Sequence, residues 1–154
     1  AVALDKISGA KVTAVEIDET AFSYLETNVK ENNSSVKPVM ADALEICETF
    51  ADGELDLIVS NPPYIKSADI ETLQKEVQLE PRLALDGGED GCYFYREIVN
   101  RWSRKLKKGG ALAFELGEGQ ADTVKALMTE QGFSDFKISL DFGGVQRAII
   151  GTLL

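Results

Sequence analysis

Histidine is absent from the 154 residues of this chain, and cysteine occurs only twice. The absence of histidine excludes a Ser-His-Asp triad, a histidine general base and a histidine-ligated zinc site. Cys47 and Cys92 are far apart in the sequence and fit no metal-binding spacing, so we expect reduced thiols in a cytoplasmic protein. Any chemistry that the chain performs must use other residue types.

Positive charge and long apolar runs are also scarce. The 16 lysine and arginine residues face 26 aspartate and glutamate residues, which gives a net charge of −10. This balance argues against a broad electrostatic surface for nucleic acid, although it does not exclude an enzyme that modifies bases. No apolar run approaches a membrane span, and no signal peptide opens the chain. We expect residues 1–154 to form a single domain with its own core.

Strand-like and helix-like segments alternate along the chain. We predict helices over residues 1–7, 18–32, 44–50, 92–108 and 120–131, and strands over residues 11–17, 36–41, 55–60, 111–116, 136–140 and 146–152. Repeated strand–helix units predict an α/β fold with a mainly parallel sheet, ending in an antiparallel pair. Residues 65–91 show no clean period apart from a short helix expected near residues 69–75, and long loops of this kind are usually functional.

The most informative stretch is residues 58–65, where an apolar β-branched run ends in Asn-Pro-Pro-Tyr. The run predicts a buried central strand, and the two prolines end it because neither can donate a ladder hydrogen bond. Pro62 also restricts Asn61 to extended backbone at the carboxyl end of the strand. Ligands bind at that edge in open α/β sheets, so residues 61–64 are the predicted site.

The residue types of this turn suit an amino group attached to a planar π system. The Asn61 side-chain oxygen and the Pro62 carbonyl can each accept one hydrogen bond from an NH2 group, and the Tyr64 ring can stack on its plane. Such a nitrogen is a poor nucleophile because its lone pair is delocalised. Holding both hydrogens aims the nitrogen at an electrophile and favours the tetrahedral nitrogen of the transition state. The turn therefore predicts catalysis by orientation and electrostatics.

Two acidic residues follow other predicted strands at the same edge. Glu16 ends the strand at residues 11–17, and an acid there commonly binds a ribose in nucleotide-binding α/β folds. A surface acid that favours the next helix N-terminus is an equally good interpretation. Asp42 follows the strand at residues 36–41, and a helix N-cap is its alternative interpretation. Asp18 and Thr20 are better interpreted as caps.

Together these motifs resemble the release-factor-specific protein-(glutamine-N5) methyltransferases of the HemK/PrmC type. An NPPY run alone marks amino-group methyltransferases broadly, whereas NPPY followed by EP-x-x-AL-x-GG-x-DG is far more specific. The resemblance runs nearly end to end, through AVEID (14–18), Asn28, Asp42, VSNPPYI (59–65), EPRLALDGGEDG (80–91), KGGALAFELGEGQ (108–120) and DFGGVQRAIIG (141–151).

The resemblance implies a Rossmann-like class I methyltransferase sheet with an antiparallel terminal strand, and S-adenosylmethionine as the cofactor. It implies that Glu16 binds the cofactor ribose, with Ile17 following it against the adenine. It also implies that Asp42 lies near the adenine amino group, with Ala43 beside it, and that Asn61 contributes to the cofactor site.

On the acceptor side, the resemblance implies methylation of the glutamine side chain in the Gly-Gly-Gln motif of peptide-chain release factors. The active-site loop that holds this glutamine is matched by Asn61, Pro62, Pro63 and Tyr64. Glu80, Pro81 and the glycines at positions 87, 88 and 91 match a family signature, which we expect to shape the long loop beside the active site. We assign this segment no chemical step.

The chain departs from the family pattern at its start. Family members have an N-terminal helical domain that engages the release factor, and a first strand followed by a D-x-G-x-G-x-G loop that cradles the cofactor. Neither is present. We therefore expect a C-terminal piece of a longer enzyme, in which strands 11–17 and 55–60 are left with unpaired edges. Such a piece is expected to pair with a second copy or to close these strands together, and to bind S-adenosylmethionine weakly or not at all.

Two other functions stay open at this point. An N6-adenine or exocyclic-guanine methyltransferase acting on nucleic acid would also take an NH2 group on a planar system, although the acidic balance and the signature at residues 80–91 weigh against it. The other is a non-catalytic binding domain, because the 154 residues alone could be an inactive fragment.

Overall fold

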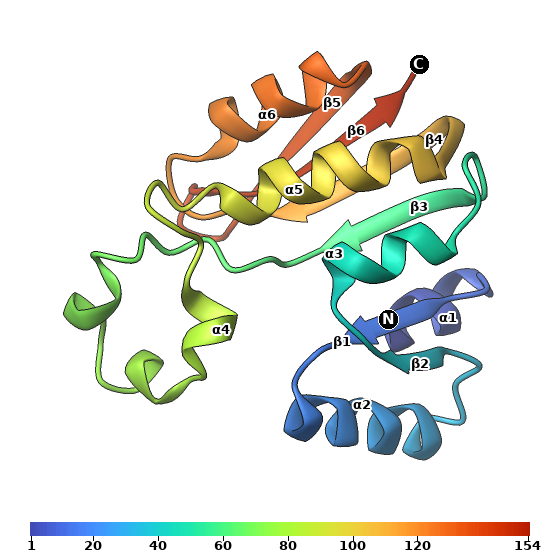
Figure 1. Ribbon diagram of the computed structural model, residues 1–154, viewed down its shortest axis with the longest axis horizontal. Coiled ribbons are helices and arrows are strands. Elements are labelled where there is room, and N and C mark those ends of the chain that lie inside the picture. The colour runs from blue at the N-terminus through green and yellow to red at the C-terminus, as the bar shows by residue number, and fades with distance from the viewer. The chain divides into compact units, whose positions relative to one another are not determined.

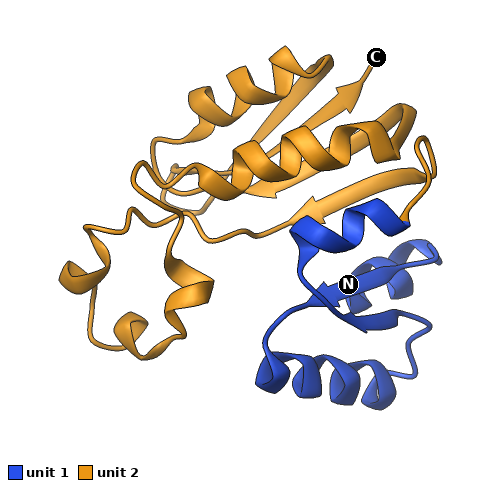
Figure 2. Ribbon diagram, viewed as in Figure 1, with its two compact units in different colours: residues 1–49 blue, residues 50–154 orange.

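The computed structural model describes all of residues 1–154, which fold into two compact units (Figure 2). Unit 1 comprises residues 1–49 and unit 2 comprises residues 50–154. Each unit contains its own sheet, with two strands in unit 1 and four in unit 2. None of the helices combines the length and the apolar character needed to cross a membrane.

Unit 1 is a strand–helix–strand unit with a parallel two-stranded sheet (Figure 1). Its elements are α1 (Val2–Ser8), β1 (Thr13–Glu16), α2 (Glu19–Glu31), β2 (Lys37–Met40), α3 (Ala43–Ile46) and the 3-10 helix η1 (Cys47–Thr49). Gly9, at φ 66°, ends α1 with its N–H on the Asp5 carbonyl, as glycine does at many helix ends. The Asp18 side chain accepts a hydrogen bond from the N–H of Ala21 and caps α2, which confirms its predicted role.

A largely buried carboxylate ties α1 to the turn before β2. Asp5 Oδ2 accepts hydrogen bonds from the Ser34 hydroxyl at 2.5 Å and the Ser35 N–H at 2.9 Å. Its Oδ1 accepts one from the Ser35 hydroxyl at 2.5 Å. These hydrogen bonds, with that of Ser34 the largest cause, lower the pKa of Asp5 from 3.8 to about 2.

We expect unit 1 to lose stability in acid through Asp5. Between pH 3.8 and about 2 the folded state binds fewer protons at Asp5 than the unfolded state, so stability falls as the pH drops through that window. Asp5→Asn removes this proton uptake, and its melting temperature should fall less steeply between those pH values. Circular dichroism melts across the window measure the slope, with Glu31→Gln on exposed α2 as the control. Equal slopes for Asp5→Asn and the wild type would contradict the assignment.

Unit 2 is built on a mixed four-stranded sheet in the order β3-β4-β6-β5. The β3–β4 pair is parallel, and the β4–β6 and β5–β6 pairs are antiparallel, so the predicted antiparallel terminal pair is confirmed. Its elements are β3 (Leu55–Ser60), the 3-10 helices η2 (Ile70–Thr72) and η3 (Val77–Leu79), α4 (Arg82–Leu85), α5 (Tyr93–Trp102), the 3-10 helix η4 (Ser103–Lys105), β4 (Leu106–Glu115), α6 (Ala121–Glu130), β5 (Phe133–Leu140) and β6 (Gln146–Leu153).

The core of unit 2 lies between its sheet and the helices α5 and α6, which run side by side over one face (Figure 1). Tyr95 is fully buried, and its ring meets Phe114 of β4 edge-on, with 5.2 Å between the ring centroids. Each large apolar side chain buried in this way contributes about 1.5–3 kcal/mol. The other fully buried large side chains of this unit are Leu112, Leu116, Met128, Ile149, Val99 and Val124.

The position of β3 combines two sequence-based predictions. The apolar run alone predicted a buried central strand, which is wrong because β3 is the terminal strand of the four-stranded sheet. The open edges expected for strands 11–17 and 55–60 are confirmed, since β1 and β3 each end their own sheet, and the alternative that these two strands pair with each other is wrong. Leu57 is 41% exposed and Val59 56% exposed. An apolar β-branched run indicates that a segment forms a strand, but it does not indicate how many strands pair with it. The composition of a strand therefore does not predict its position in the sheet.

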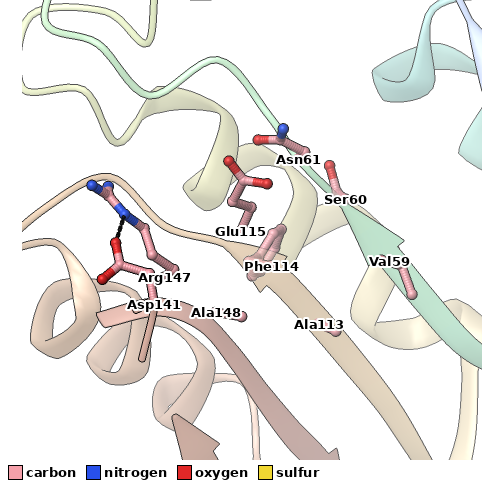
Figure 3. A pocket seen from close by; sticks show the side chains of 9 residues that line it. All are labelled: Val59, Ser60, Asn61, Ala113, Phe114, Glu115, Asp141, Arg147 and Ala148. Atoms are coloured by element: carbon pink, nitrogen blue, oxygen red, sulfur yellow. Dashed lines mark hydrogen bonds and ion pairs between the residues drawn. The ribbon is translucent and has the colours of Figure 1, made fainter. Parts of the chain in front are cut away.

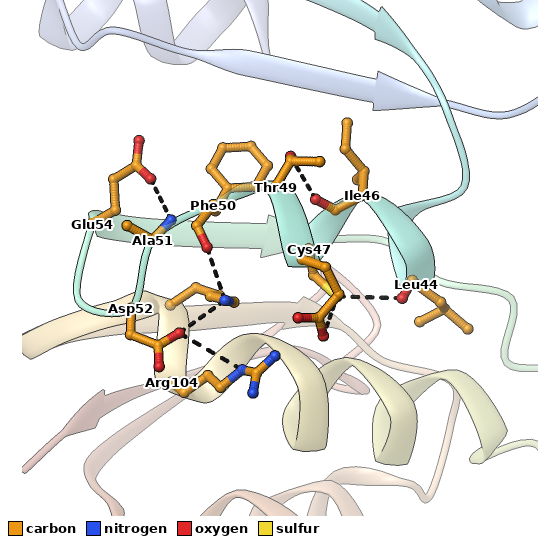
Figure 4. A network of polar contacts seen from close by, with 11 residues as sticks. Leu44, Ile46, Cys47, Thr49, Phe50, Ala51, Asp52, Glu54 and Arg104 are labelled. Atoms are coloured by element: carbon orange, nitrogen blue, oxygen red, sulfur yellow. Dashed lines mark hydrogen bonds and ion pairs between the residues drawn. The ribbon is translucent and has the colours of Figure 1, made fainter.

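The helix predicted for residues 92–108 ends earlier than expected, at Trp102, and Leu106 already belongs to β4. The Lys105 side chain, in the 3-10 turn between helix and strand, is only 5% exposed, and its ammonium group donates to the Phe50 carbonyl and to Asp52 Oδ1, both at 2.8 Å. Figure 4 labels these two acceptor residues. Phe94, Ile98, Trp102 and Leu106 recur every four residues in the sequence, which favours one long helix, but the last of them lies in β4.

Candidate active site

The Asn-Pro-Pro-Tyr turn leaves the carboxyl end of β3, as the sequence predicts. Asn61 is exposed, and its side chain has no hydrogen-bond partner within the protein. The Pro62 carbonyl oxygen also has none. Because both prolines have a fixed φ and lack an N–H, the turn is stiff and cannot be drawn into the sheet. Two hydrogen-bond acceptors, one on the Asn61 side chain and one on the backbone, are therefore free to receive a ligand.

An open cavity of about 570 Å³ lies beside this turn. Its lining includes the Asn61 amide, the Glu115 carboxylate and an ion pair between Arg147 and Asp141, in which Nε and Oδ2 are 2.9 Å apart (Figure 3). The pKa of Asp141 is lowered, first by a hydrogen bond from the Val145 N–H and then by Arg147. The remaining lining residues are Val59, Ser60, Ala113, Phe114 and Ala148.

Three glycines surround Tyr64 closely. A Cβ atom on Gly87 would lie 2.7 Å from the Tyr64 Cα, and one on Gly91 would lie 2.5 Å from the Tyr64 carbonyl oxygen. A Cβ atom on Gly117 would lie 2.9 Å from the edge of the Tyr64 ring. Real side chains do not approach so closely, so only glycine fits at these positions. Two glycines of the signature, Gly87 and Gly91, therefore lie directly against Tyr64, whereas a Cβ atom on Gly88 would meet the Tyr93 side chain instead.

The Tyr64 hydroxyl lies 3.5 Å from Glu115 Oε1 at the rim of the cavity. Burial, the largest cause, and the nearby Glu115 charge both raise the pKa of Tyr64 above 10. The phenol is therefore neutral at physiological pH and can donate a hydrogen bond while its ring presents an apolar face.

The long loop after the turn is closed at its base. Ile65 and Asp86 form a parallel bridge, in which the Ile65 N–H donates to the Leu85 carbonyl and the Gly87 N–H donates to the Ile65 carbonyl. The Ser67 hydroxyl donates to Asp86 Oδ1 at 2.5 Å and is the largest cause of the lowered pKa of Asp86. Residues 66–85 therefore form a closed excursion. It holds η2, near the predicted short helix, and also η3 and α4, which the sequence pattern did not indicate.

In unit 1, Glu16 and Asp42 lie at the carboxyl ends of the adjacent parallel strands β1 and β2, whose last pair joins Glu16 to Met40. Glu16 Oε1 accepts hydrogen bonds from the N–H groups of Ile17 and Asp18, at 2.8 and 2.9 Å. Asp42 Oδ1 accepts one from the Leu44 N–H at 2.7 Å and caps α3. The interpretation of Asp42 as a helix cap is thus correct, and the cap involves only one of the two carboxylate oxygens of Asp42.

Each of these carboxylates keeps its second oxygen without a partner in the protein, while backbone N–H groups fix the first. Such oxygens accept hydrogen bonds from a ribose diol or an exocyclic amine, so the pair fits an adenosine-containing cofactor. Ile17 is 47% exposed and offers an apolar surface beside Glu16, and Ala43 is exposed at the start of α3. The predicted cofactor residues are therefore gathered in unit 1, apart from Asn61 in unit 2.

Comparison with known proteins gives a consistent family. The sequence profile of the methyltransferase small domain matches residues 1–89. The release factor glutamine methyltransferase of Geobacter sulfurreducens is 42% identical over 99% of this chain and 54% of its own length. That of Thermodesulfovibrio yellowstonii is 33% identical over 91% of the chain and 50% of its own length. The chain thus spans about half the length of these relatives, whose name agrees with the resemblance found in the motifs.

Solved structures agree on the fold. A methyltransferase from Pyrococcus furiosus matches with a TM-score of 0.73 and 25% identity, over 97% of this chain and 66% of its own. A SAM dependent methyltransferase from Archaeoglobus fulgidus matches with a TM-score of 0.63 and 16% identity, over 97% of this chain and 79% of its own. The predicted Rossmann-like α/β class is therefore confirmed.

Proposed function

Because the chain belongs to the methyltransferase small domain family, we propose that the protein methylates a glutamine side chain with S-adenosylmethionine as the methyl donor. The acceptor is the amide nitrogen of the glutamine in the Gly-Gly-Gln motif of peptide-chain release factors. The main support is the turn at residues 61–64, which presents two free acceptors to an NH2 group. Relatives of that name at 33% and 42% identity add to it.

On the acceptor side, the Asn61 side-chain oxygen and the Pro62 carbonyl each accept one hydrogen of the glutamine NH2. Both interactions strengthen as positive charge develops on the nitrogen, so they stabilise the transition state more than the bound substrate. The Tyr64 ring covers the amide plane, and its neutral hydroxyl adds no charge to the site. The cavity beside Asn61 receives the rest of the glutamine side chain.

On the donor side, Glu16 and Asp42 would hold the adenosine part of the cofactor with their free carboxylate oxygens, and Ile17 and Ala43 would cover it. When bound, S-adenosylmethionine would supply an electrophilic methyl group on a sulfonium sulfur, and its S–CH3 bond would break to leave the neutral thioether S-adenosylhomocysteine. The acceptor nitrogen needs no strong base, because its N–H becomes acidic once the nitrogen is alkylated and the proton passes to water. We also propose that residues 1–154 serve as one catalytic domain and that the reaction takes place in the cytoplasm.

Labelled methyl transfer tests the function. The full natural protein that carries this sequence is incubated with methyl-labelled donor and, in parallel, with a release factor, the same factor with its Gly-Gly-Gln glutamine changed to alanine, and DNA and RNA. We expect label only in the unchanged release factor, at that glutamine. Label in nucleic acid would instead support the adenine or guanine alternative, and no transfer to any acceptor would favour a non-catalytic domain.

We also propose that the isolated 154-residue chain self-associates through β3. This strand ends the sheet of unit 2, and its exposed Leu57 and Val59 make its edge apolar. An exposed, apolar strand edge is a template for pairing with a second copy. Sedimentation velocity should show a larger species as the concentration rises, and Val59→Lys should weaken it. A sedimentation coefficient that is the same at every concentration would contradict self-association.

A further inference from the structure

Gln120 connects three segments that are far apart in the sequence. Its Nε2 donates to the Tyr64 carbonyl at 3.0 Å and to the Gly91 carbonyl at 3.1 Å. Its Oε1 accepts from the Gly117 N–H at 3.0 Å, and the Tyr95 hydroxyl lies 3.3 Å away. Two carbonyls facing the nitrogen and an N–H facing the oxygen allow only one orientation of this amide. We propose that Gln120 is a positioning residue for the turn at residues 61–64, an inference that rests on the proposed function.

The support for Gln120 is itself rigid. Gln120 is the N-cap residue of α6, and the fully buried Tyr95 of α5 donates its hydroxyl to the Glu115 carbonyl at 2.9 Å. Burial raises the pKa of Tyr95, so this hydroxyl stays protonated throughout the physiological range. The Gln120 amide is thus fixed to the α5–α6 layer of the core, which is the least mobile kind of support in a small domain.

The group that Gln120 fixes is one peptide unit of the turn. The carbonyl of the Tyr64–Ile65 peptide is bonded to Gln120 Nε2, and its N–H is bonded to the Leu85 carbonyl at 3.0 Å. A peptide held at both ends cannot rotate. Between it and β3 stand Pro62 and Pro63, whose φ angles are fixed. The position of the Asn61 and Pro62 oxygens is therefore set by β3 at one end and by Gln120 at the other.

Loss of this tether should act on the chemical step. Gln120 does not line the cavity beside Asn61, and its hydrogen bonds go to Tyr64, Gly91, Tyr95 and Gly117, so the methyl donor should bind as before. An acceptor amide misplaced by about 1 Å costs about 100-fold in rate. We therefore expect Gln120→Met and Gln120→Glu to lower kcat by about 100-fold while the KM for S-adenosylmethionine stays unchanged. The Glu variant keeps the size of the side chain but turns a carboxylate toward two carbonyl oxygens.

Two further variants complete the experiment on the full natural protein. Gly117→Ala keeps the glutamine in the sequence but puts a Cβ 2.5 Å from its Oε1 and 2.9 Å from the Tyr64 ring, so it should displace both the amide and the turn that it holds and lower kcat similarly. Gln131→Met, at the other end of α6, removes an exposed hydrogen bond to Asn100 and should behave as the wild type. Wild-type kcat in both Gln120 variants would overturn the proposal, and so would a lowered kcat in Gln131→Met.

Amide hydrogen exchange separates this proposal from the proposed function. The Gly117 N–H should exchange faster in Gln120→Met, which removes its acceptor oxygen, but not in Gln120→Glu, which keeps one. The Gly87 N–H should exchange faster in both variants while core amides of α5 stay protected, whether or not the protein methylates a release factor. If the wild type transfers no methyl group, the proposed function fails and the exchange rates alone decide whether Gln120 tethers the turn. Unchanged exchange at Gly87 in both variants would overturn the tether even in an active enzyme.

Discussion

Asn61→Ala is expected to lower kcat for release-factor methylation by about 100- to 1,000-fold, the usual effect of removing one hydrogen-bonding group aimed at developing charge. The Asn61 side-chain oxygen has no partner within the protein, so its hydrogen-bonding capacity is available to the acceptor amide. Its interaction with the NH2 group strengthens as the nitrogen becomes positively charged. The change should therefore appear in kcat more than in the KM for the release factor.

Asn61→Asp is the matched variant, because a carboxylate keeps an acceptor oxygen at the same distance from the backbone. We expect it to retain more activity than Asn61→Ala. The family resemblance implies that Asn61 also contributes to the cofactor site, and calorimetric titration with S-adenosylmethionine tests this. A higher Kd for S-adenosylmethionine in Asn61→Ala would show that part of the loss of activity comes from weaker donor binding. A kcat for Asn61→Ala within tenfold of the wild type would contradict the assigned role.

The features of the fold and the site that the sequence could predict are those determined by residues adjacent in the chain. A β-branched run followed by two prolines fixes where a strand stops, and the structure ends β3 at the predicted Ser60. Asp18 before an amphipathic helix is likewise a local cap signal that the structure confirms. The local pattern alone placed β3 at the centre of a sheet, because strand order depends on contacts between distant segments. Its open edge followed only from the family pattern, in which the first strand is missing from this chain.

Gly109 and Gly110 show how one local signal can have two meanings. They directly follow the helix predicted for residues 92–108, where a glycine pair is a usual helix stop. In the structure they lie inside β4, where the register with β3 shifts between the pairs Leu55–Leu106 and Leu57–Ala111. Gly109 has φ +78°, which a β-bulge and a helix terminus both require, so sequence cannot distinguish them. Gln120 appeared in the sequence only as the last residue of the matched stretch 108–120 and the first of a predicted helix, with no role assigned, since three of its four hydrogen-bond partners, at positions 64, 91 and 95, are distant in the chain.

Gly91→Ala is expected to produce the largest loss of stability of any single methyl addition in unit 2. Gly91 has φ +74°, which costs a residue with a Cβ about 1–2 kcal/mol. The added methyl would also lie 2.5 Å from the Tyr64 carbonyl oxygen and 2.8 Å from Gln120 Nε2. Overpacking of this kind costs about 1–3 kcal/mol more. We therefore expect a total loss of about 2–5 kcal/mol in the free energy of unfolding, measured in urea.

Two other glycines separate the components of this loss. Gly53 has φ +69° and open space around it, so Gly53→Ala should show the backbone cost alone. Gly87 has an ordinary φ, but its Cβ would lie 2.7 Å from the Tyr64 Cα, so Gly87→Ala should show the packing cost alone. If Gly91→Ala is no less stable than Gly53→Ala, the contact with Tyr64 is not tight. The Gly91→Ala protein can also relieve the overlap with Tyr64 by releasing residues 85–92 from the turn, and its free energy of unfolding then changes little. In that case methyl transfer must fall as it does in the Gln120 variants, because the same Tyr64 carbonyl loses its anchor.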